Sequence, residues 1–252
     1  IIVVIFIILI KKRKNKMITD KFKDTALSFA GCDGGNLKSD VWFCGLEWGG
    51  EQKNTLDPAI DENSVYSWSH EDFDGSWLAQ YNQKICWFLW YFYSLEWNNG
   101  ENSEVFVKHH HILYNQQENG IGFKMNMLPI GFPNRNNIDW NETLQKLTGL
   151  KSFNEYREWC VIHRGKFFRN AVRKYQPKVI ICTGITETDR FIRFFTAEEE
   201  YETVMTEQFK FHYAKFENTL ICVVPFFGGA NGINSYAKME NLVAEVKDLL
   251  KT

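Results

Sequence analysis

Two kinds of apolar pattern alternate along the chain and predict strands that alternate with helices. Short apolar runs, bounded by polar or glycine-rich turns, lie at 41–45, 105–107 with 111–113, 121–128, 178–183 and 219–225. Runs of this length between turn residues are typical of strands. At least three of them are continuous rather than alternating, which indicates a sheet that is covered on both faces.

Longer segments between these runs repeat their apolar residues with helical spacing. They lie at 77–97, 153–175, 186–196 and 235–251. Strands that alternate with helices predict an α/β protein, a three-layer α/β/α sandwich with a mostly parallel central sheet. Ligands of such sheets bind at the carboxyl ends of the strands, so the residues that follow each strand are the candidates for function.

The first sixteen residues, IIVVIFIILIKKRKNK, differ in pattern from the rest of the chain. Ten apolar residues are too few for a bilayer, which needs about 20, and the basic run follows them, the reverse of a secretory signal. We interpret residues 1–16 as an N-terminal extension translated from upstream sequence, before Met17. The tail of a truncated membrane helix is the competing interpretation. Residues 17–252 show no repeat or linker and are expected to form a single α/β domain with no membrane segment.

Composition limits the partners of this domain. A formal net charge of −2 and 44% hydrophobic residues are ordinary for a soluble globular protein. Any contact with DNA is therefore expected to be regional. The six cysteines include no Cys-x-x-Cys pair, which predicts reduced thiols in a cytoplasmic protein and neither a metal nor another cofactor.

The first predicted strand ends in a turn that carries an acid and an indole, Gly45-Leu46-Glu47-Trp48-Gly49-Gly50. Glycines allow the backbone to turn sharply and to approach a ligand closely. Glu47 is then expected to project over the edge of the sheet, where a carboxylate can orient a water molecule. A tight structural turn with a solvated Glu47 is the alternative.

The third predicted strand contains a polar residue, Asn126, in the sequence KMNMLP. An amide in an apolar strand is costly unless it is paired, and it offers a donor and an acceptor on one edge. That edge suits a pyrimidine or a purine. The alternative is an Asn126 bonded to neighbouring backbone, the commoner fate of a buried Asn.

The last predicted strand leads into the glycine-rich loop VPFFGGANGINS, residues 224–235. Two consecutive Phe residues beside small turn residues form a poor core segment, so both rings are expected to be exposed. An aromatic loop tip can insert between bases, and N–H groups at a helix start can hold a phosphate. The candidate nucleic-acid contacts are Phe227, Gly228, Gly229, Asn231, Asn234 and Ser235. A long connection whose Phe rings pack inward is the alternative.

The most basic region of the domain is 157–178, REWCVIHRGKFFRNAVRKYQPK. Its Arg164, Arg169 and Arg173 are candidates to follow a phosphate backbone. An amphipathic helix with a solvated charged face is the alternative.

Two other segments carry less specific signals. His109-His110-His111 lacks a third ligand at metal-site spacing, so a surface or packed triplet is expected instead of a metal site. The acidic, aromatic segment 57–77 predicts either a lid over the strand ends or a surface insertion without function.

In order and rough spacing, these motifs resemble those of the uracil-DNA glycosylase superfamily over most of residues 36–240. That family has an α/β fold whose first motif has the form Gly-apolar or Gln-Asp/Asn-Pro-Tyr/Gly. Its middle strand carries a base-reading Asn, and its last motif is His-Pro-Ser in a loop that enters the minor groove. The resemblance implies that Glu47 positions water and that Asn126 reads an extruded base. The residues that would contact this base are Gly45, Leu46, Trp48, Asn126 and Phe226.

The chain also departs from the family pattern. Trp48 replaces the family Pro, Glu47 is one methylene longer than the usual Asp, and Val224 and Phe226 flank Pro225 where His and Ser belong. The missing His would have stabilised the negative charge on a departing uracil. A glycosylase for a modified or deaminated base in DNA is therefore one hypothesis. A non-catalytic module that binds a nucleobase, nucleotide or nucleic acid is the second, and an unrelated α/β hydrolase or transferase that uses Glu47 as base is the third.

Overall fold

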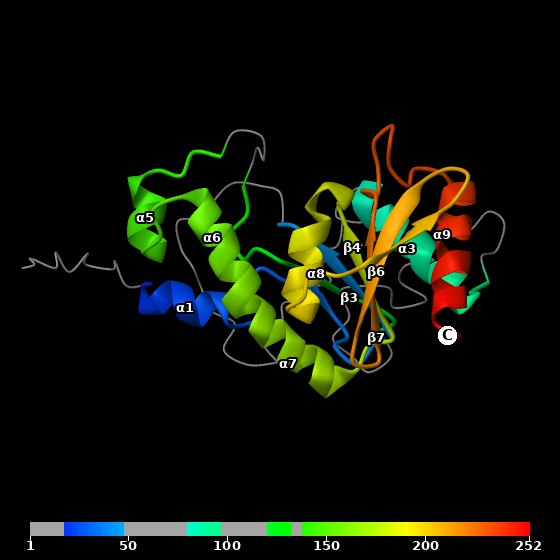
Figure 1. Ribbon diagram of the computed structural model, residues 1–252, viewed down its shortest axis with the longest axis horizontal. Helices are drawn as coiled ribbons and strands as arrows, with labels where there is room; N and C mark the ends of the chain where they lie inside the picture. Colours follow the sequence, from blue (N-terminus) through cyan, green and yellow to red (C-terminus); the bar gives the residue numbers. More distant parts are fainter. Residues whose placement is uncertain (1–17, 48–79, 97–119, 133–137) are drawn as a thin grey trace, which may run out of the picture.

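A seven-stranded sheet forms the centre of the molecule in the computed structural model, which describes residues 18–47, 80–96, 120–132 and 138–252 (Figure 1). In spatial order its strands are β1 (Gly34–Gly35), β3 (Phe123–Asn126), β2 (Val41–Gly45), β4 (Val179–Thr183), β7 (Thr219–Val224), β6 (Lys210–Phe216) and β5 (Glu202–Met205). The four strands from β3 to β7 in this order are parallel, and β1, β6 and β5 are antiparallel to their neighbours. The prediction of an α/β protein with a mostly parallel sheet is confirmed.

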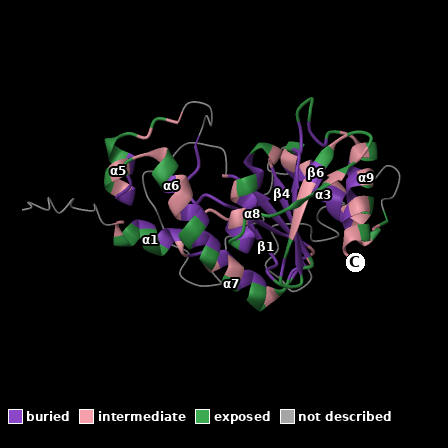
Figure 2. Ribbon diagram, in the orientation of Figure 1, coloured by how far each residue is buried: buried purple, intermediate pink, exposed green. Residues whose placement is uncertain are grey.

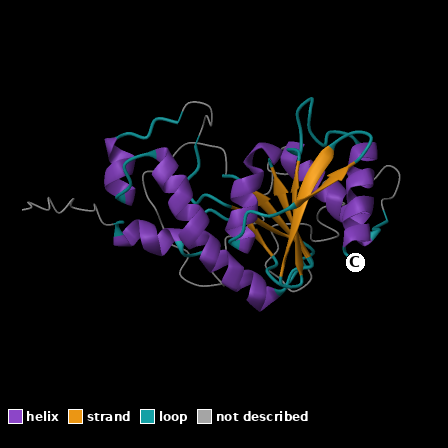
Figure 3. Ribbon diagram, in the orientation of Figure 1, coloured by secondary structure: helices purple, strands orange, loops and turns teal. Residues whose placement is uncertain are grey.

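Helices cover both faces of this sheet (Figure 3). The core on one face is covered by α7 (Gly165–Tyr175) and α8 (Thr188–Thr196), and α1 (Asp20–Ala26), α5 (Glu142–Thr148) and α6 (Phe153–Trp159) extend the same apolar cluster to the side of the sheet (Figure 1). The other face carries α3 (Gln80–Tyr93) and α9 (Tyr236–Leu249). A π-helical turn, η2 (Cys160–Arg164), joins α6 to α7, and the short 3-10 helix η3 (Ile185–Glu187) precedes α8.

Each central strand contributes to two apolar cores, one on each face of the sheet. In β2, Trp42 and Cys44 belong to the core under α7 and α8, whereas Val41 and Phe43 belong to the core under α3 and α9. All five residues of β2 are therefore buried (Figure 2). This explains why the strand reads as a continuous apolar run, because neither face meets water.

The strongest sequence patterns coincide with structural elements. The runs at 41–45, 178–183 and 219–225 form β2, β4 and β7, and the segment 121–128 narrows to β3. The helical segment 235–251 forms α9, whose N-cap Ser235 accepts a hydrogen bond from Lys238 N. The runs at 105–107 and 111–113 lie outside the described residues.

The pattern does not predict the last two strands on one side of the sheet, the edge strand β5 and its neighbour β6. Residues of β5 are mostly exposed, and β6 mixes exposed and half-buried positions with only two buried ones, Phe211 and Phe216. Strands at the margin of a sheet bury little apolar area, so the hydrophobic signal that reveals central strands is weak in them.

The close contact between α7 and α8 depends on a glycine at the start of α7. A Cβ atom on Gly165 would lie 2.7 Å from the Phe194 carbonyl oxygen of α8. Any other residue would force the two helices apart. The segment 153–175, predicted as one helix, is helical throughout, and the π turn η2 divides it into α6 and α7.

Candidate functional site at the carboxyl edge of the sheet

The ends of β2 and β3 lie side by side at the carboxyl edge of the sheet. Gly45 and Asn126 are register partners, and Met127 N donates to Gly45 O over 2.9 Å. A Cβ atom on Gly45 would lie 2.5 Å from Asn126 Oδ1, so only glycine fits beside this amide. The first and middle motifs, whose Gly45 and Asn126 are 81 positions apart in the sequence, are therefore in direct contact.

The amide of Asn126 is oriented by two buried acceptors. Its Nδ2 donates to Gly31 O at 2.8 Å and to Asp33 Oδ2 at 3.1 Å, and the residue is only 2% exposed. Because both partners accept, the nitrogen faces them and Oδ1 faces Gly45. The alternative of a backbone-bonded Asn126 is correct in part, since one of its two acceptors is a carbonyl and the other a carboxylate.

A buried ion pair extends this arrangement. Lys124 Nζ lies 3.1 Å from Asp33 Oδ1 and donates to Asn82 Oδ1 of α3 at 3.2 Å. Lys124 and Asn126 share one face of β3, because alternate residues of a strand point the same way. A charged pair in a buried position is stable only when its remaining polar atoms are also bonded, as they are here by two amides.

The sequence analysis missed Asp33, Lys124 and Asn82. Lys124 carried a usable signal, because a lysine inside the apolar run IGFKMNML requires a partner if the strand is buried on both faces. Its partners could not be identified, since Asp33 and Asn82 are 91 and 42 positions away.

Tyr81 of α3 links this polar group to the ends of β4 and β7. Its hydroxyl is 2.9 Å from Thr183 Oγ1, at the end of β4. Its ring lies under Lys124 Nζ, 5.2 Å from the ring centroid, and stacks on Phe226, just after β7, with centroids 5.5 Å apart. Burial raises the pKa of the Tyr81 phenol, so it stays a neutral hydrogen-bonding group. Through Tyr81, α3 thus contacts β3, the end of β4 and the residue that follows Pro225 after β7.

The two consecutive Phe residues after β7 have opposite environments. Phe226 is 53% exposed, whereas Phe227 is fully buried against Phe43 and Tyr81. The expectation that both rings are exposed is therefore wrong for Phe227, and a direct contact of Phe227 with nucleic acid is excluded in this conformation. The inward-packing alternative describes Phe227, and the exposed-tip hypothesis is retained for Phe226.

The rest of this loop is a closed turn. Phe226 O accepts from Gly228 N at 2.9 Å and from Ile233 N at 3.0 Å, and a Cβ atom on Gly232 would overlap the carbonyl oxygens of Phe226 and Gly228. Gly228 is buried, whereas the candidate contacts Gly229, Asn231 and Asn234 are exposed. The loop therefore holds Phe226 outward on a rigid backbone.

Glu47 is held on the segment that follows β3. Its Oε2 accepts from Phe132 N at 2.7 Å, across 85 positions of sequence, and the residue is half-buried. Phe132 packs among Trp140, Phe153 and Tyr156. The preceding residue, Leu46, belongs to the core on the α7 face. Glu47 is therefore an anchored carboxylate, and the alternative of a freely solvated Glu47 is not observed.

Arg164, a candidate phosphate contact, is fully buried. The π turn directs its guanidinium inward, where it donates to the carbonyl oxygens of Ala26, Ser28 and Ala30 at 2.7–2.9 Å and of Asn126 at 3.3 Å. A buried guanidinium with four carbonyl partners cannot reach a phosphate, so this candidate is wrong. Regular helical spacing gave no sign of this, because the π turn shifts the direction of the following side chains.

The other two arginines differ in their accessibility. Arg169 donates to the carbonyl oxygens of Phe194 and Arg193 near the end of α8, at 2.6 and 3.2 Å. Burial, and then the charge of Arg173, lower the pKa of Arg169. Arg173 is exposed, lies over the Phe216 ring and pairs with Glu217 at 2.9 Å. Of the three, Arg173 alone presents its charge to solvent.

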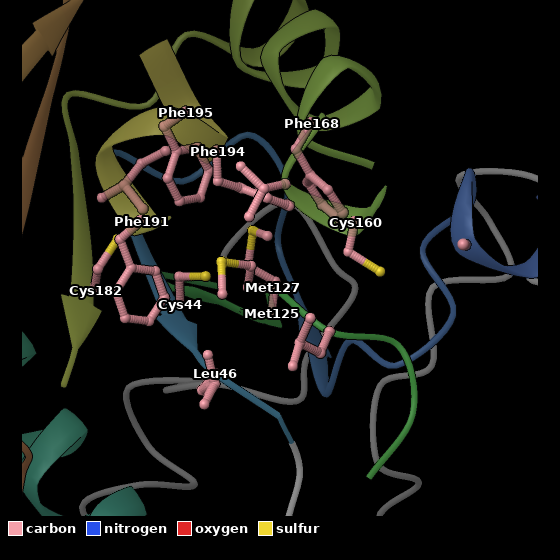
Figure 4. Packing of buried hydrophobic residues seen from close by; sticks show 14 of the residues in the cluster. Cys44, Leu46, Met125, Met127, Cys160, Phe168, Cys182, Phe191, Phe194 and Phe195 are labelled. Atoms are coloured by element: carbon pink, nitrogen blue, oxygen red, sulfur yellow. The ribbon is translucent and has the colours of Figure 1, made fainter. Parts of the chain in front are cut away.

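Sulfur atoms gather in the core behind this edge. Cys44 and Cys182 are register partners on β2 and β4, and Cys44 is the register partner of Met125 on β3. Figure 4 shows these side chains together with Met127 and the ring of Phe191. All six cysteines are free thiols, as their isolated spacing predicted, and five are buried. Burial raises the pKa of the Cys160 thiol to about 12, so this thiol stays protonated and unreactive at neutral pH.

Several sequence-based candidates lie outside the described residues. They are Trp48, Gly49, Gly50, the segment 57–77, the triplet at 109–111 and residues 1–17. In the described part of the chain, no three His, Cys, Asp or Glu side chains gather to hold a metal ion. None of the helices described is long and apolar enough to cross a membrane.

Comparison with known proteins adds no family assignment. No protein-family model matches the chain, and no curated protein matches it either.

Proposed function

We propose that the protein recognises a nucleobase at the carboxyl edge of its sheet and excises a modified or deaminated base from DNA, in the manner of a divergent uracil-DNA glycosylase. The observation that carries the proposal is the direct contact between Gly45 and Asn126. Gly45 is followed two residues later by Glu47, whose carboxylate is held by Phe132 N. The resemblance places the water-positioning acid and the base-reading amide at these two strand ends. The exposed Phe226, stacked on Tyr81, offers a further aromatic surface for a flat ligand.

In this proposal Glu47 acts as the general base. Its carboxylate accepts a proton from a water molecule, whose oxygen attacks C1′ of the deoxyribose while the N-glycosidic bond breaks. The electron pair of that bond leaves on the base. The hydrogen bond from Phe132 N keeps the carboxylate in one orientation, which is what positioning of water requires. Asn126, oriented by Asp33, would accept from an N–H group of the base through Oδ1.

A non-catalytic nucleobase-binding module is the second candidate, and a specific observation favours it. The end of β7, Val224 followed by Pro225, is buried and apolar and carries no side chain that can donate a proton or hold a charge. A departing base with a negative charge therefore lacks the preorganised side-chain partner that typically contributes several kcal/mol to such a step. Binding without cleavage would need no such partner.

Base release from DNA distinguishes the two candidates. Duplex and single-stranded oligonucleotides that contain uracil, hypoxanthine or xanthine are incubated with the protein, and abasic sites are detected by alkaline cleavage. We expect release from at least one substrate, abolished in Glu47→Gln and retained in Glu240→Gln, an exposed glutamate of α9. Binding of the same oligonucleotides without release by any of them supports the second candidate. Neither binding nor release contradicts both.

A further inference from the structure

The sheet ends on one side in an open strand, β5, far along the sheet from β2 and β3. β5 pairs with β6 and is the last strand of the described sheet. At the end of this hairpin Thr206 N donates to Phe209 O at 2.9 Å. Because bonded and non-bonded residues alternate in an antiparallel pair, Thr203 and Met205 direct their backbone N–H and C=O groups to the outer edge.

This edge carries only some of the features that usually prevent strand addition: its four residues include one charged side chain, Glu202, whose protection is weakest against a basic strand. Natural edge strands are protected by charged residues, especially lysine, by proline, by bulges or by shortness. β5 contains no lysine or proline, and the side chain of Met205 is 72% exposed with Glu202 and Thr203 exposed beside it. The opposite edge, β1, is protected, since it has only two residues and both are buried.

The charged residues of β5 and its flanking segment are all acidic, and the nearest base across the hairpin is Lys210, the register partner of Met205. Residues 198–207 contain five exposed glutamates and no lysine or arginine: Glu198, Glu199, Glu200, Glu202 and Glu207. One of them, Glu199, pairs with Arg193 at 3.5 Å, and another, Glu202, accepts from the Tyr213 hydroxyl. An added strand would run alongside these carboxylates and would be selected by their charge.

We propose that β5 binds an extended, Lys/Arg-rich polypeptide segment, which adds to the sheet as a further strand. Main-chain hydrogen bonds to Thr203 and Met205 supply the pairing, and the flanking glutamates select a basic segment. The exposed Met205 contributes an apolar contact for an uncharged residue between the basic ones. A second copy of this chain fits poorly, because it would bring five more exposed carboxylates to the same edge.

The test uses the unmodified protein and two fluorescein-labelled heptapeptides of sequence Lys-Val-Lys-Val-Lys-Val-Lys. One has a normal backbone, and the other is N-methylated at alternate residues, so that its charge is the same but it cannot pair along one edge. Fluorescence anisotropy at physiological ionic strength measures both affinities. We expect the normal peptide to bind at least about tenfold more tightly. Equal binding of the two peptides, or no binding of either, overturns the proposal.

Variants of the protein test the same edge independently. Met205→Pro removes an outward N–H, and the double change Glu198→Lys with Glu200→Lys reverses the charge. Each should weaken binding of the normal peptide by about tenfold or more. Glu240→Lys on α9 should leave the affinity for this peptide unchanged. If Met205→Pro fails to fold by circular dichroism, the peptide pair alone decides. A dimer in sedimentation analysis that Met205→Pro abolishes would make a second copy the occupant and would overturn a basic partner.

Discussion

Asp33 holds Asn126 and Lys124 at once, with both side-chain nitrogens 3.1 Å from its carboxylate oxygens. One carboxylate therefore orients the amide at the centre of the candidate site and neutralises the only lysine in β3. The buried structure and the proposed recognition of a base therefore depend on the same carboxylate. Substitution of Asp33 therefore tests whether this buried group serves stability alone or also the proposed site.

The change Asp33→Asn keeps the shape of the side chain but leaves Lys124 without its counter-charge. Removal of one partner of a buried ion pair typically lowers the free energy of unfolding by about 3–5 kcal/mol. We expect a loss of this size in urea unfolding. The double variant Asp33→Asn with Lys124→Met should recover a large part of it, because no charge is then left buried. Additive losses would contradict the coupling.

Gly45→Ala tests the contact between the two motifs. The new methyl group would meet Asn126 Oδ1 at 2.5 Å, so one strand end must move. We expect a loss of about 1–3 kcal/mol in the free energy of unfolding, typical of overpacking. If the proposed function is correct, base binding is lost as well. Unchanged stability together with unchanged binding would show that the two strand ends are not packed as described.

The adjacent rings of Phe226 and Phe227 form a matched pair for truncation. Phe227→Ala should lower the free energy of unfolding by about 3–5 kcal/mol, because this ring is fully buried. Phe226→Ala should change stability by less than about 1 kcal/mol, because the ring is half exposed. A stacked base typically contributes about 1–3 kcal/mol, so Phe226→Ala should instead weaken oligonucleotide binding by about tenfold. A larger stability loss at Phe226 than at Phe227 would contradict the loop conformation.

The buried thiols predict how stability depends on pH. The folded protein holds Cys86 and Cys160 as neutral thiols with the pKa raised to about 12, against an ordinary value of 9.0. Above pH 9 the unfolded chain loses these protons while the folded chain keeps them. The free energy of unfolding should therefore fall between pH 9 and pH 12, by about 1.4 kcal/mol per pH unit for each such thiol. Urea unfolding at pH 8, 9 and 10 measures the slope, which Cys86→Ala should reduce.

Residues 41–45 and 219–225 show which parts of the fold could be predicted. Both are continuous apolar runs between turns, so local pattern alone identifies a central strand with two covered faces. Gly45, Glu47 and Asn126 could be predicted as site residues for the same reason, because a glycine turn or a polar side chain at the end of an apolar strand is easily recognised in the sequence.

Asp33, Asn82 and Tyr81 could not be predicted, for a physical reason. Each is unremarkable in its own segment and acquires its role from partners more than 40 positions away, such as Lys124 and Thr183. The different environments of Phe226 and Phe227 likewise depend on the fold, because adjacent residues point to opposite sides of a loop whose path the sequence does not specify. The inward direction of Arg164 depends on a π turn that apolar spacing does not reveal.

Arg164 also determines which parts of the molecule can open together. Its guanidinium donates to the carbonyl of Ala26 at the end of α1, to two carbonyls between α1 and β1, and to the carbonyl of Asn126 at the end of β3. If α1 detached, the buried guanidinium of Arg164 would lose hydrogen-bond acceptors. We therefore expect α1, β1 and the edge of the sheet that carries Asn126 to open as one cooperative unit in hydrogen exchange. The first described helix should therefore be protected from hydrogen exchange to the same degree as the edge of the sheet that carries Asn126.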